Sequence, residues 1–247
     1  MAERPEGRPR FLDRLLDPAA FVRTIDSRVV EPTLQVALKE ESRISSTVAV
    51  LVAIFLEATL PYRIANHPRY LIPALALLLL IATLGVMPRR FDHSRLFRGL
   101  MLLVILVMTI GNIASGARLI VDLVNGTGIR DAGELLWVGG SIWLTNVIVF
   151  ALWYWEFDGG GPMARLKSGN PYPAFLFPQH QTPERVRPGW RPEFLDYFYV
   201  SFTNAAAFSP TDTMPMTRWA KMAMFVQSAF SLSIAILVIA RAVNVLQ

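Results

Sequence analysis

Three oxygen-bearing side chains, those of Ser209, Thr211 and Asp212, fall within one short turn near the end of the sequence. Hydroxyl and carboxylate oxygens are ligands for hard cations, so this group could line a weakly selective path for cations. A simpler use competes with it, because Ser209 or Asp212 could cap the free N–H groups of the following helix while the turn plugs the bundle. The sequence leaves both uses open.

Two apolar segments of unequal length flank this turn. Residues 193–208 are about one helical turn too short to cross a hydrocarbon core, which takes about 20 apolar residues, whereas residues 222–243 are long enough. We therefore expect the first segment to dip into the membrane as a short helix and the second to span it.

The tail carries a recognisable set of residues: the stretch Tyr199–Phe202, Asp212 after the turn, Pro215, and Thr217 before the last helix. In these features it resembles the pore-loop module of potassium-channel-type ion channels, and it is similar to uncharacterised bacterial membrane proteins with a degenerate selectivity filter. The resemblance is confined to residues 193–247. It implies a homo-oligomer, a tetramer in such channels, with four loops around one axis and monovalent cations as the transported species.

The residues at the filter position depart from the potassium pattern. Where a potassium filter reads Thr-Val-Gly-Tyr-Gly, this sequence has Ala207, Phe208, Ser209, Pro210 and Thr211. Glycine adopts positive φ at little cost, which lets successive carbonyls face the ion, whereas proline fixes φ near −65°. We therefore expect a weakly selective or cation-conducting path in place of a potassium-selective filter, with Asn204 as a hydrogen-bond donor behind it.

The composition places the chain among membrane proteins. Hydrophobic residues make up 53% of 247 residues and the mean hydropathy is +0.39, so the apolar stretches need a lipid bilayer around them. Four further apolar segments have the length of spanning helices, at residues 46–62, 70–87, 96–121 and 134–155. The expected fold is an all-α membrane protein with five transmembrane helices and a re-entrant pore-helix hairpin before the last one, in a bacterial inner membrane.

Four regions follow from this layout. Residues 1–43 are charged, lack the apolar run of a signal peptide and suit an amphipathic arm. Residues 44–156 form a four-helix membrane bundle, and residues 157–192, rich in Gly and Pro, form an extramembrane loop without regular helix or strand. Residues 193–247 hold the re-entrant helix, the turn and the final transmembrane helix.

Three ionisable residues fall inside or at the edge of the apolar segments, where a charge needs a partner or water: Glu57, Arg118 and Arg241. If the helices alternate in direction, all three are displaced toward the same side of the membrane. We expect Glu57 to pair with Arg118 or Arg241, although both arginines could instead extend independently to the interface.

The distribution of arginines predicts an orientation. The stretch 89–98 contains four arginines opposed by Asp92, and cytoplasmic loops are rich in such residues. This places the N-terminus and the loop before the hairpin in the cytoplasm, whereas a potassium channel has its loop on the opposite face. Either the hairpin enters from the cytoplasm, or the N-terminus lies outside, or the number of spans differs by one.

The residue types speak against several other functions. Cysteine is absent, and His67, His93 and His180 are scattered without partners at ligand spacing, so we expect no metal site and no cofactor. The basic residues are spread over several loops, which argues against nucleic-acid binding.

No catalytic cluster lies at a membrane boundary, so we expect no enzyme. The four carboxylates near the ends of the apolar segments suit interfacial charges: Glu156, Asp158, Glu193 and Asp196.

A small-solute transporter, or a non-conducting structural membrane protein, is the alternative. Polar and small residues of two helices could line a solute cavity, although such residues are also typical of helix packing: Gly111, Asn112, Ser115, Gly116 and Asn146. The halves of the chain show no internal repeat, which argues against a transporter.

Overall fold

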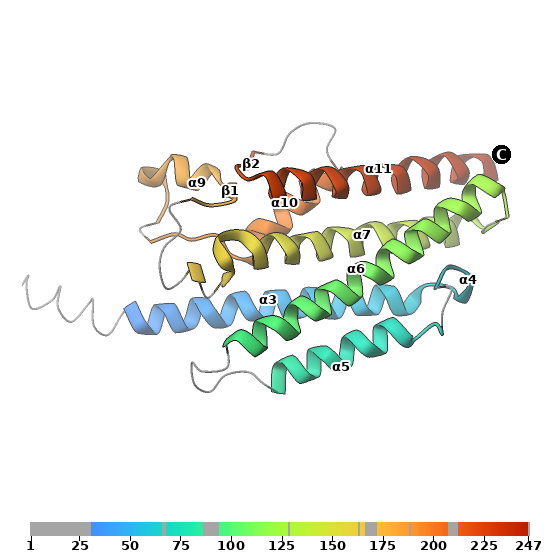
Figure 1. The fold of residues 1–247 in the computed structure, drawn as a ribbon. Coiled ribbons are helices and arrows are strands. Elements are labelled where there is room, and N and C mark those ends of the chain that lie inside the picture. The colour runs from blue at the N-terminus through green and yellow to red at the C-terminus, as the bar shows by residue number, and fades with distance from the viewer. Residues whose placement is uncertain are drawn as a thin grey trace, which may run out of the picture. The chain divides into compact units, whose positions relative to one another are not determined.

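The computed structural model describes residues 31–65, 68–85, 94–127, 129–162, 164–165, 172–187, 189–206 and 212–246. Its α-helices are α3 (Glu31–Thr59), α4 (Tyr62–Ala65), α5 (Leu71–Gly85), α6 (Ser94–Asn125), α7 (Ala132–Phe157), α9 (Pro178–Gln181), α10 (Phe194–Ala206) and α11 (Arg218–Leu246), drawn in Figure 1. The shorter elements are the 3-10 helices η3 (Asp158–Gly160) and η4 (Pro183–Arg185) and the strands β1 (Phe175–Leu176) and β2 (Met214–Pro215).

The chain divides into two compact units, Met1–Ile44 and Ser45–Gln247. Of the first unit, the structure describes the beginning of α3. Pro32 lies there in the first helical turn, where a missing backbone N–H leaves no hydrogen bond unmade. The rest of the arm expected over residues 1–43 lies outside the described residues.

Three helices of the second unit are long and apolar enough to cross a membrane. They cover Leu96–Asn125 in α6, Ala132–Gly160 in α7 and η3, and Arg218–Val245 in α11. The last three spanning segments expected from the sequence lie inside them. The protein is therefore mostly helical and carries three helices of membrane-crossing length.

The first two expected spans correspond to shorter apolar helices, Ile44–Thr59 at the end of α3 and Leu71–Gly85 in α5. The first expected span, 46–62, stops at Thr59 because Pro61 follows, and the residue before a proline disfavours helical backbone angles. Within the described part of the chain, three apolar helices are thus long enough to cross a membrane and two are shorter.

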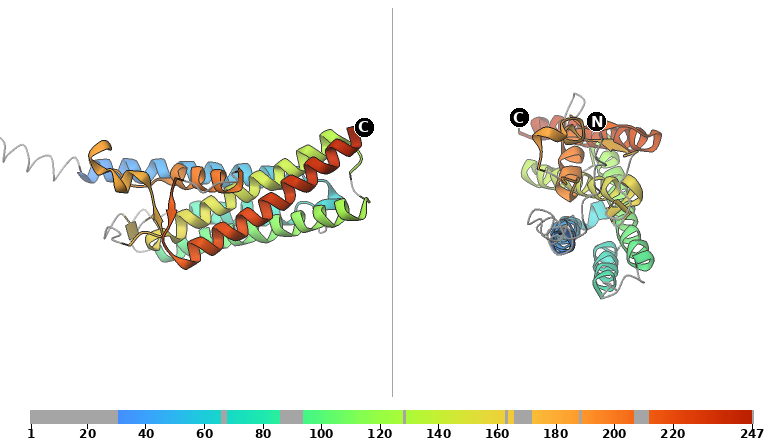
Figure 2. Two further views of the ribbon diagram at one scale, coloured as in Figure 1. Left: turned by 90° about the horizontal axis from the view of Figure 1, so that it is seen from above. Right: turned by 90° about the vertical axis from the view of Figure 1, so that its left-hand side faces the viewer.

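Helix α7 is the centre of the second unit. It packs against α6, α10 and α11, while α5 packs against α6 (Figure 1). In the most apolar stretch of each long helix, the buried share is 67% for α7, 44% for α6 and 28% for α11. The left-hand view of Figure 2 shows α7 and α11 running lengthwise beside each other. Helix α11 therefore leaves most of its apolar surface uncovered by its own chain.

The contact between α7 and α11 is close because small residues lie in it. A Cβ atom on Gly139 of α7 would lie 2.6 Å from Cγ2 of Val238 on α11, which is nearer than packed atoms allow. Gly116 of α6 likewise leaves room for the ring of Phe230. Such close approach of backbones is how helices pack where lipid removes the hydrophobic driving force.

The Gly- and Pro-rich stretch between α7 and α10 contains short regular elements. Its strand β1 pairs antiparallel with β2, with Phe175 opposite Pro215 and Leu176 opposite Met214. The backbone N–H of Met216 extends this ladder by donating to the oxygen of Ala174 at 2.8 Å. The expectation that residues 157–192 hold no helix or strand is wrong at β1, whose backbone is satisfied by pairing with a distant strand, and at α9, a single turn that begins at Pro178.

Candidate functional site: the α10–α11 hairpin

We use the name hairpin for α10, α11 and the residues between them, 194–246. Helix α10 has 13 residues, as the short apolar segment in the sequence predicted. Its buried residues Phe194, Tyr197, Val200 and Ser201 recur at helical spacing and form the face that packs on α7. The hydroxyl of Ser201 donates to the backbone oxygen of Val147 on α7 at 2.6 Å.

A fully buried glutamine of α11, Gln227, connects the hairpin to α7. Its side-chain oxygen accepts hydrogen bonds from the hydroxyl of Tyr154 at 2.6 Å and from the amide of Asn204 at 2.8 Å. Its side-chain nitrogen donates to the backbone oxygen of Ser201 at 3.0 Å and to the hydroxyl oxygen of the same residue at 2.7 Å. All four hydrogen-bonding positions of the amide are thus used, and three helices meet at one side chain.

Asn204, which the sequence suggested as a donor behind an ion path, is turned toward α11. Its amide also donates to the backbone oxygen of Met224 at 3.0 Å, and its own backbone oxygen accepts from the hydroxyl of Ser228 at 3.0 Å. These bonds fix the inner end of α10 against α11. A role for Asn204 behind a path of ions stays a prediction.

Helices α10 and α11 begin at the same end of the second unit. The ring of Phe175 in β1 contacts both Tyr197, in the first turn of α10, and Trp219, in the first turn of α11. Strand β2, which directly precedes α11, pairs with β1. The start of α10, strand β2 and the start of α11 therefore lie close together around β1.

The residues expected to line an ion path are described only in part. Asp212 is exposed, and the hydroxyl of Tyr199 lies 3.4 Å from its carboxylate. Ala207, Phe208, Ser209, Pro210 and Thr211 lie outside the described residues.

The cap of α11 is Thr217. Its hydroxyl accepts a hydrogen bond from the backbone N–H of Ala220 at 3.4 Å, two residues into the helix from Arg218. Asp212 is separated from the helix by β2, so the suggestion that Asp212 caps α11 is wrong. The carboxylate of Asp212 remains at the surface, at the end where the hairpin begins.

A second polar centre lies where α7 ends, at residues expected from the sequence to be interfacial charges. Asp158 is fully buried. One of its carboxylate oxygens accepts from the backbone N–H of Ala174 at 2.7 Å and the other from the hydroxyl of Tyr197 at 2.6 Å. Asp158 therefore joins the end of α7, the residue before β1 and the start of α10.

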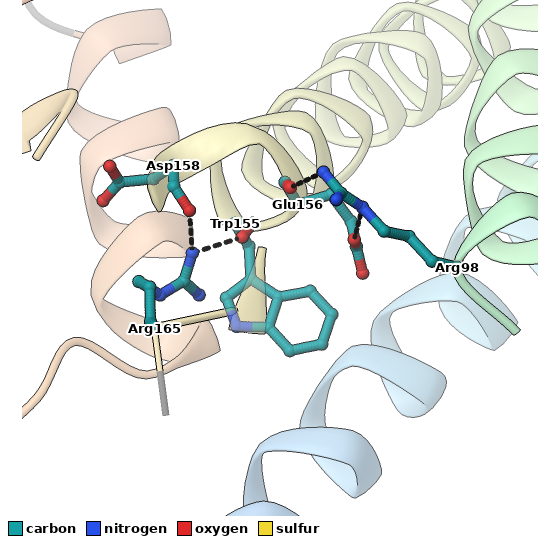
Figure 3. A network of polar contacts seen from close by, with 5 residues as sticks. All are labelled: Arg98, Trp155, Glu156, Asp158 and Arg165. Carbon is teal, nitrogen blue, oxygen red and sulfur yellow. Dashed lines mark hydrogen bonds and ion pairs between the residues drawn. The ribbon is translucent and has the colours of Figure 1, made fainter. Parts of the chain in front are cut away.

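Two arginines satisfy the free backbone oxygens at the end of α7, and Figure 3 shows them on opposite sides of the helix. Arg165 donates to the oxygens of Trp155 at 2.8 Å and Asp158 at 2.5 Å, and Arg98 of α6 donates to the oxygen of Glu156 at 3.1 Å. Arg98 also forms an ion pair with the buried carboxylate of Glu156, 3.7 Å apart. Cations at a helix C-terminus are favourable because carbonyl dipoles point there.

No local sequence pattern identifies this centre as a unit. Asp158 directly follows a run of aromatic residues and precedes three glycines, which is a sign of a helix end, whereas its partner Tyr197 lies 39 residues away. Glu156 and Asp158 are buried within the unit, where each has partners of the same chain, and their position at a membrane boundary stays a prediction.

Burial changes the acid–base behaviour of the groups around the start of α10. It raises the pKa of the Tyr197 hydroxyl well above its usual value of 10.0, so this group remains a proton donor to Asp158. It raises the pKa of Asp196, whose carboxylate accepts from the backbone N–H of Glu193 at 2.7 Å. It lowers the pKa of His180, whose Nδ1 accepts from the backbone N–H of Phe177 at 3.2 Å.

The three intramembrane charges expected from the sequence are not brought together as ion pairs. Glu57 is 3% exposed and accepts a hydrogen bond from the hydroxyl of Ser115 at 3.1 Å. Arg118 lies 3.9 Å from Asp122 on its own helix, with 45% of its side chain exposed. Arg241 makes no ion pair with any residue that the structure describes. The expected pairing of Glu57 with an arginine is wrong because α6 offers a hydroxyl to Glu57 and directs Arg118 to the surface.

The residues considered for a solute cavity mostly contact neighbouring helices. Asn146 of α7 donates to the hydroxyl of Ser231 on α11 at 2.8 Å, and Ser115 bonds to Glu57 of α3. Gly111 and Gly116 give room to side chains of adjacent helices. Asn112 is buried, and its side-chain oxygen has no hydrogen-bond partner.

Comparison with known proteins leaves the chain without an assigned relative, since no protein family, no curated protein and no solved structure matches it.

Proposed function

We propose that the chain is one subunit of a homo-oligomeric ion channel of the pore-loop type, weakly selective or cation-conducting, in a bacterial inner membrane. In this proposal α3, α5, α6, α7 and α11 span the bilayer and α10 is the re-entrant pore helix. The observation that carries it is the path of the hairpin: a helix of 13 residues and a membrane-length helix begin at the same end of the unit. A segment that enters lipid and turns back needs protein around it, because irregular backbone at membrane depth must be satisfied.

The hydrogen bonds of α10 support this use. Ser201 bonds to α7, and Asn204 and Gln227 hold α10 to α11, so the short helix has fixed partners on both sides. These hydrogen bonds hold the C-terminal end of α10 against α11. The carboxylate of Asp212 then lies at the mouth of the path, where it would concentrate cations.

The surface of α11 supports assembly into an oligomer. Only 28% of its most apolar stretch is buried by its own chain. Lipid can cover such a surface, and so can a second copy of the chain. A channel of this type needs the second arrangement, because four hairpins around one axis are required to enclose a pore.

Ion flux into liposomes tests the proposal. We expect purified protein in liposomes to pass potassium and sodium, but not chloride, and the Asp212→Asn variant to pass them several-fold more slowly because the attraction at the mouth is lost. Glu184→Gln is the matched control, since Glu184 is an exposed carboxylate in η4 of the preceding segment. If the ion flux is unchanged in Asp212→Asn, Asp212 does not lie at the ion path.

A specific observation favours a small-solute permease or a non-conducting membrane protein as the alternative. The polar side chains of the hairpin that the structure describes inside the unit bond to one another, as Gln227 does at all four positions. A fully satisfied network is also what a sealed, structural hairpin would contain. Absence of ion flux under every gradient and voltage would favour this alternative over the channel.

A further inference from the structure

One buried ionisable group has no part in the hairpin, the carboxyl of Glu57 near the end of α3. It is 3% exposed, and it faces α6, where the hydroxyl of Ser115 donates to its Oε1 at 3.1 Å. Its other oxygen, Oε2, is buried without a hydrogen-bond partner. A carboxylate oxygen in that position loses its hydration and gains nothing in return.

The neighbours of Glu57 come from three helices. Gly111 of α6 has no side chain, and a Cβ atom there would lie 3.2 Å from Oε1 of Glu57 and 2.8 Å from Cγ2 of Ile72 on α5. The carboxyl therefore occupies the space that Gly111 leaves between α3, α5 and α6. Between Ser45 and Thr59, Glu57 is the one charged residue of α3, and α5 carries none.

The other charged groups of the surrounding helices are engaged elsewhere or exposed. Arg69 donates to the backbone oxygen of Ala58 at 3.3 Å, and Arg63 of α4 is exposed. On α6, Arg118 is paired with Asp122 and Arg98 with Glu156 of α7. Among the residues that the structure describes, Glu57 forms no ion pair. A negative charge on Glu57 would thus be uncompensated in an apolar surrounding.

A second oxygen without a partner lies on the same stretch of α6. Asn112 is 2% exposed, and its Oδ1 is buried and unbonded. It precedes Ser115 by three residues, so the two share one side of the helix. Asn112 and Glu57 thus leave two buried oxygens in this part of α3 and α6 that can only accept hydrogen bonds while Glu57 is ionised.

We propose that Glu57 is a proton-binding site between α3 and α6, occupied at neutral pH, with the proton on Oε2, the oxygen that has no partner. Ser115 continues to donate to Oε1, so the neutral acid keeps this hydrogen bond and no longer carries an uncompensated charge. The ligand is a proton and not a metal ion, because the site offers few oxygens and a sodium ion would require more of them. The proposal stands whether or not the hairpin conducts ions.

Infrared spectroscopy of the purified full-length protein in detergent tests this site. We expect the carbonyl stretch of a protonated carboxylic acid at neutral pH, its loss in Glu57→Gln, and its decline in the wild-type protein as the solution is made alkaline. Glu134→Gln is the matched control, since Glu134 is exposed in the first turn of α7 and should not contribute to this band. Gel filtration checks that Glu57→Gln keeps the fold, and the wild-type titration needs no variant.

A further variant tests the hydrogen bonding of the acid, and two results would contradict the proposal. Ser115→Ala removes the hydroxyl that donates to Oε1, so we expect the band to move to higher frequency as this hydrogen bond is lost. The proposal would be overturned if, at neutral pH, the wild-type protein and Glu57→Gln gave the same spectrum in the region of the carboxylic-acid carbonyl stretch. The proposal would also be overturned if Glu57 were ionised at neutral pH and added sodium stabilised the protein, since this would indicate a metal ion in place of the proton.

Discussion

The hydroxyl of Tyr197 and the carboxylate of Asp158 form the most enclosed side-chain hydrogen bond at the start of the hairpin, since both residues are fully buried. Replacing Tyr197 by Phe keeps the ring and removes the hydroxyl, so one carboxylate oxygen of Asp158 loses its hydrogen-bond donor. We expect Tyr197→Phe to lower the free energy of unfolding by about 1–3 kcal/mol, measured by thermal denaturation in detergent.

Tyr199 provides the control for this substitution two positions along the same helix. It is 53% exposed, and its hydroxyl lies 3.4 Å from Asp212, at the limit of a hydrogen bond. Tyr199→Phe should leave the stability nearly unchanged. Equal effects of the two variants would mean that the bond to Asp158 does not stabilise the fold.

His180 makes the segment before α10 sensitive to acid. Burial lowers its pKa below the ordinary 6.5, and its neutral ring accepts from the N–H of Phe177 and contacts Trp190. The unfolded chain takes up this proton near pH 6.5 and the folded chain only at lower pH. The contribution of His180 to stability is therefore complete above pH 6.5 and is lost as the pH falls through the lowered pKa.

Nuclear magnetic resonance of histidine-labelled protein measures this directly. We expect one histidine to titrate with a midpoint below 6.5 and its signal to be missing in His180→Gln. A midpoint at or above the ordinary value for His180 would contradict the effect of burial.

At the scale of elements, the connection of α10 to α11 and α7 depends on Gln227. Methionine has a similar length and shape without donors or acceptors, so Gln227→Met leaves the buried groups of Tyr154, Ser201 and Asn204 without their partner. We expect a loss of about 1–3 kcal/mol and faster amide exchange in α10 than in α7, measured by hydrogen–deuterium exchange.

Ser233 gives a control on the same helix. It is exposed and bonds only within α11, to the backbone oxygen of Ala229 at 2.8 Å. Ser233→Ala should leave the exchange of α10 unchanged. If Gln227→Met also leaves it unchanged, α10 is held by its apolar face alone.

The elements show what could be predicted from the sequence. The lengths of the apolar segments predicted the long helices α6, α7 and α11 and the short helix α10, because apolar length is a local property of the chain. They did not predict β1, the burial of Asp158 or the hydroxyl partner of Glu57. Each of these depends on residues far apart in the sequence, and side chains such as Tyr197 and Ser115 carry no local sign of their partner.

At the scale of the whole molecule, the positions of the arginines predict which end faces the cytoplasm. Arg98 at the start of α6 and Arg165 after α7 both bond to the end of α7, so these two arginines lie at the same end of the second unit. Since the chain contains no cysteine, single-cysteine variants report topology without background. We expect an impermeant maleimide to label Glu184→Cys only from the cytoplasmic side and Val124→Cys only from the outside.

Both positions suit this measurement. Glu184 is exposed in η4, and Val124 is 70% exposed near the end of α6, so that α7 lies between them in the sequence. Labelling of both variants from one side would show that α7 does not cross the membrane. The reverse pattern would place the mouth of the hairpin outside.

The bonds of Gln227 and the pairing of β1 with β2 also decide when the fold can be completed during synthesis. Helix α10 leaves the ribosome before the residues that satisfy it, because Met224 and Gln227 follow it in the chain and β1 must wait for Met214. Until the first half of α11 has been made, α10 can contact α7 and the segment that precedes α10, but its amide at Asn204 has neither acceptor. A nascent chain that stalls within α11 therefore presents an unfinished hairpin to the insertion and quality-control machinery.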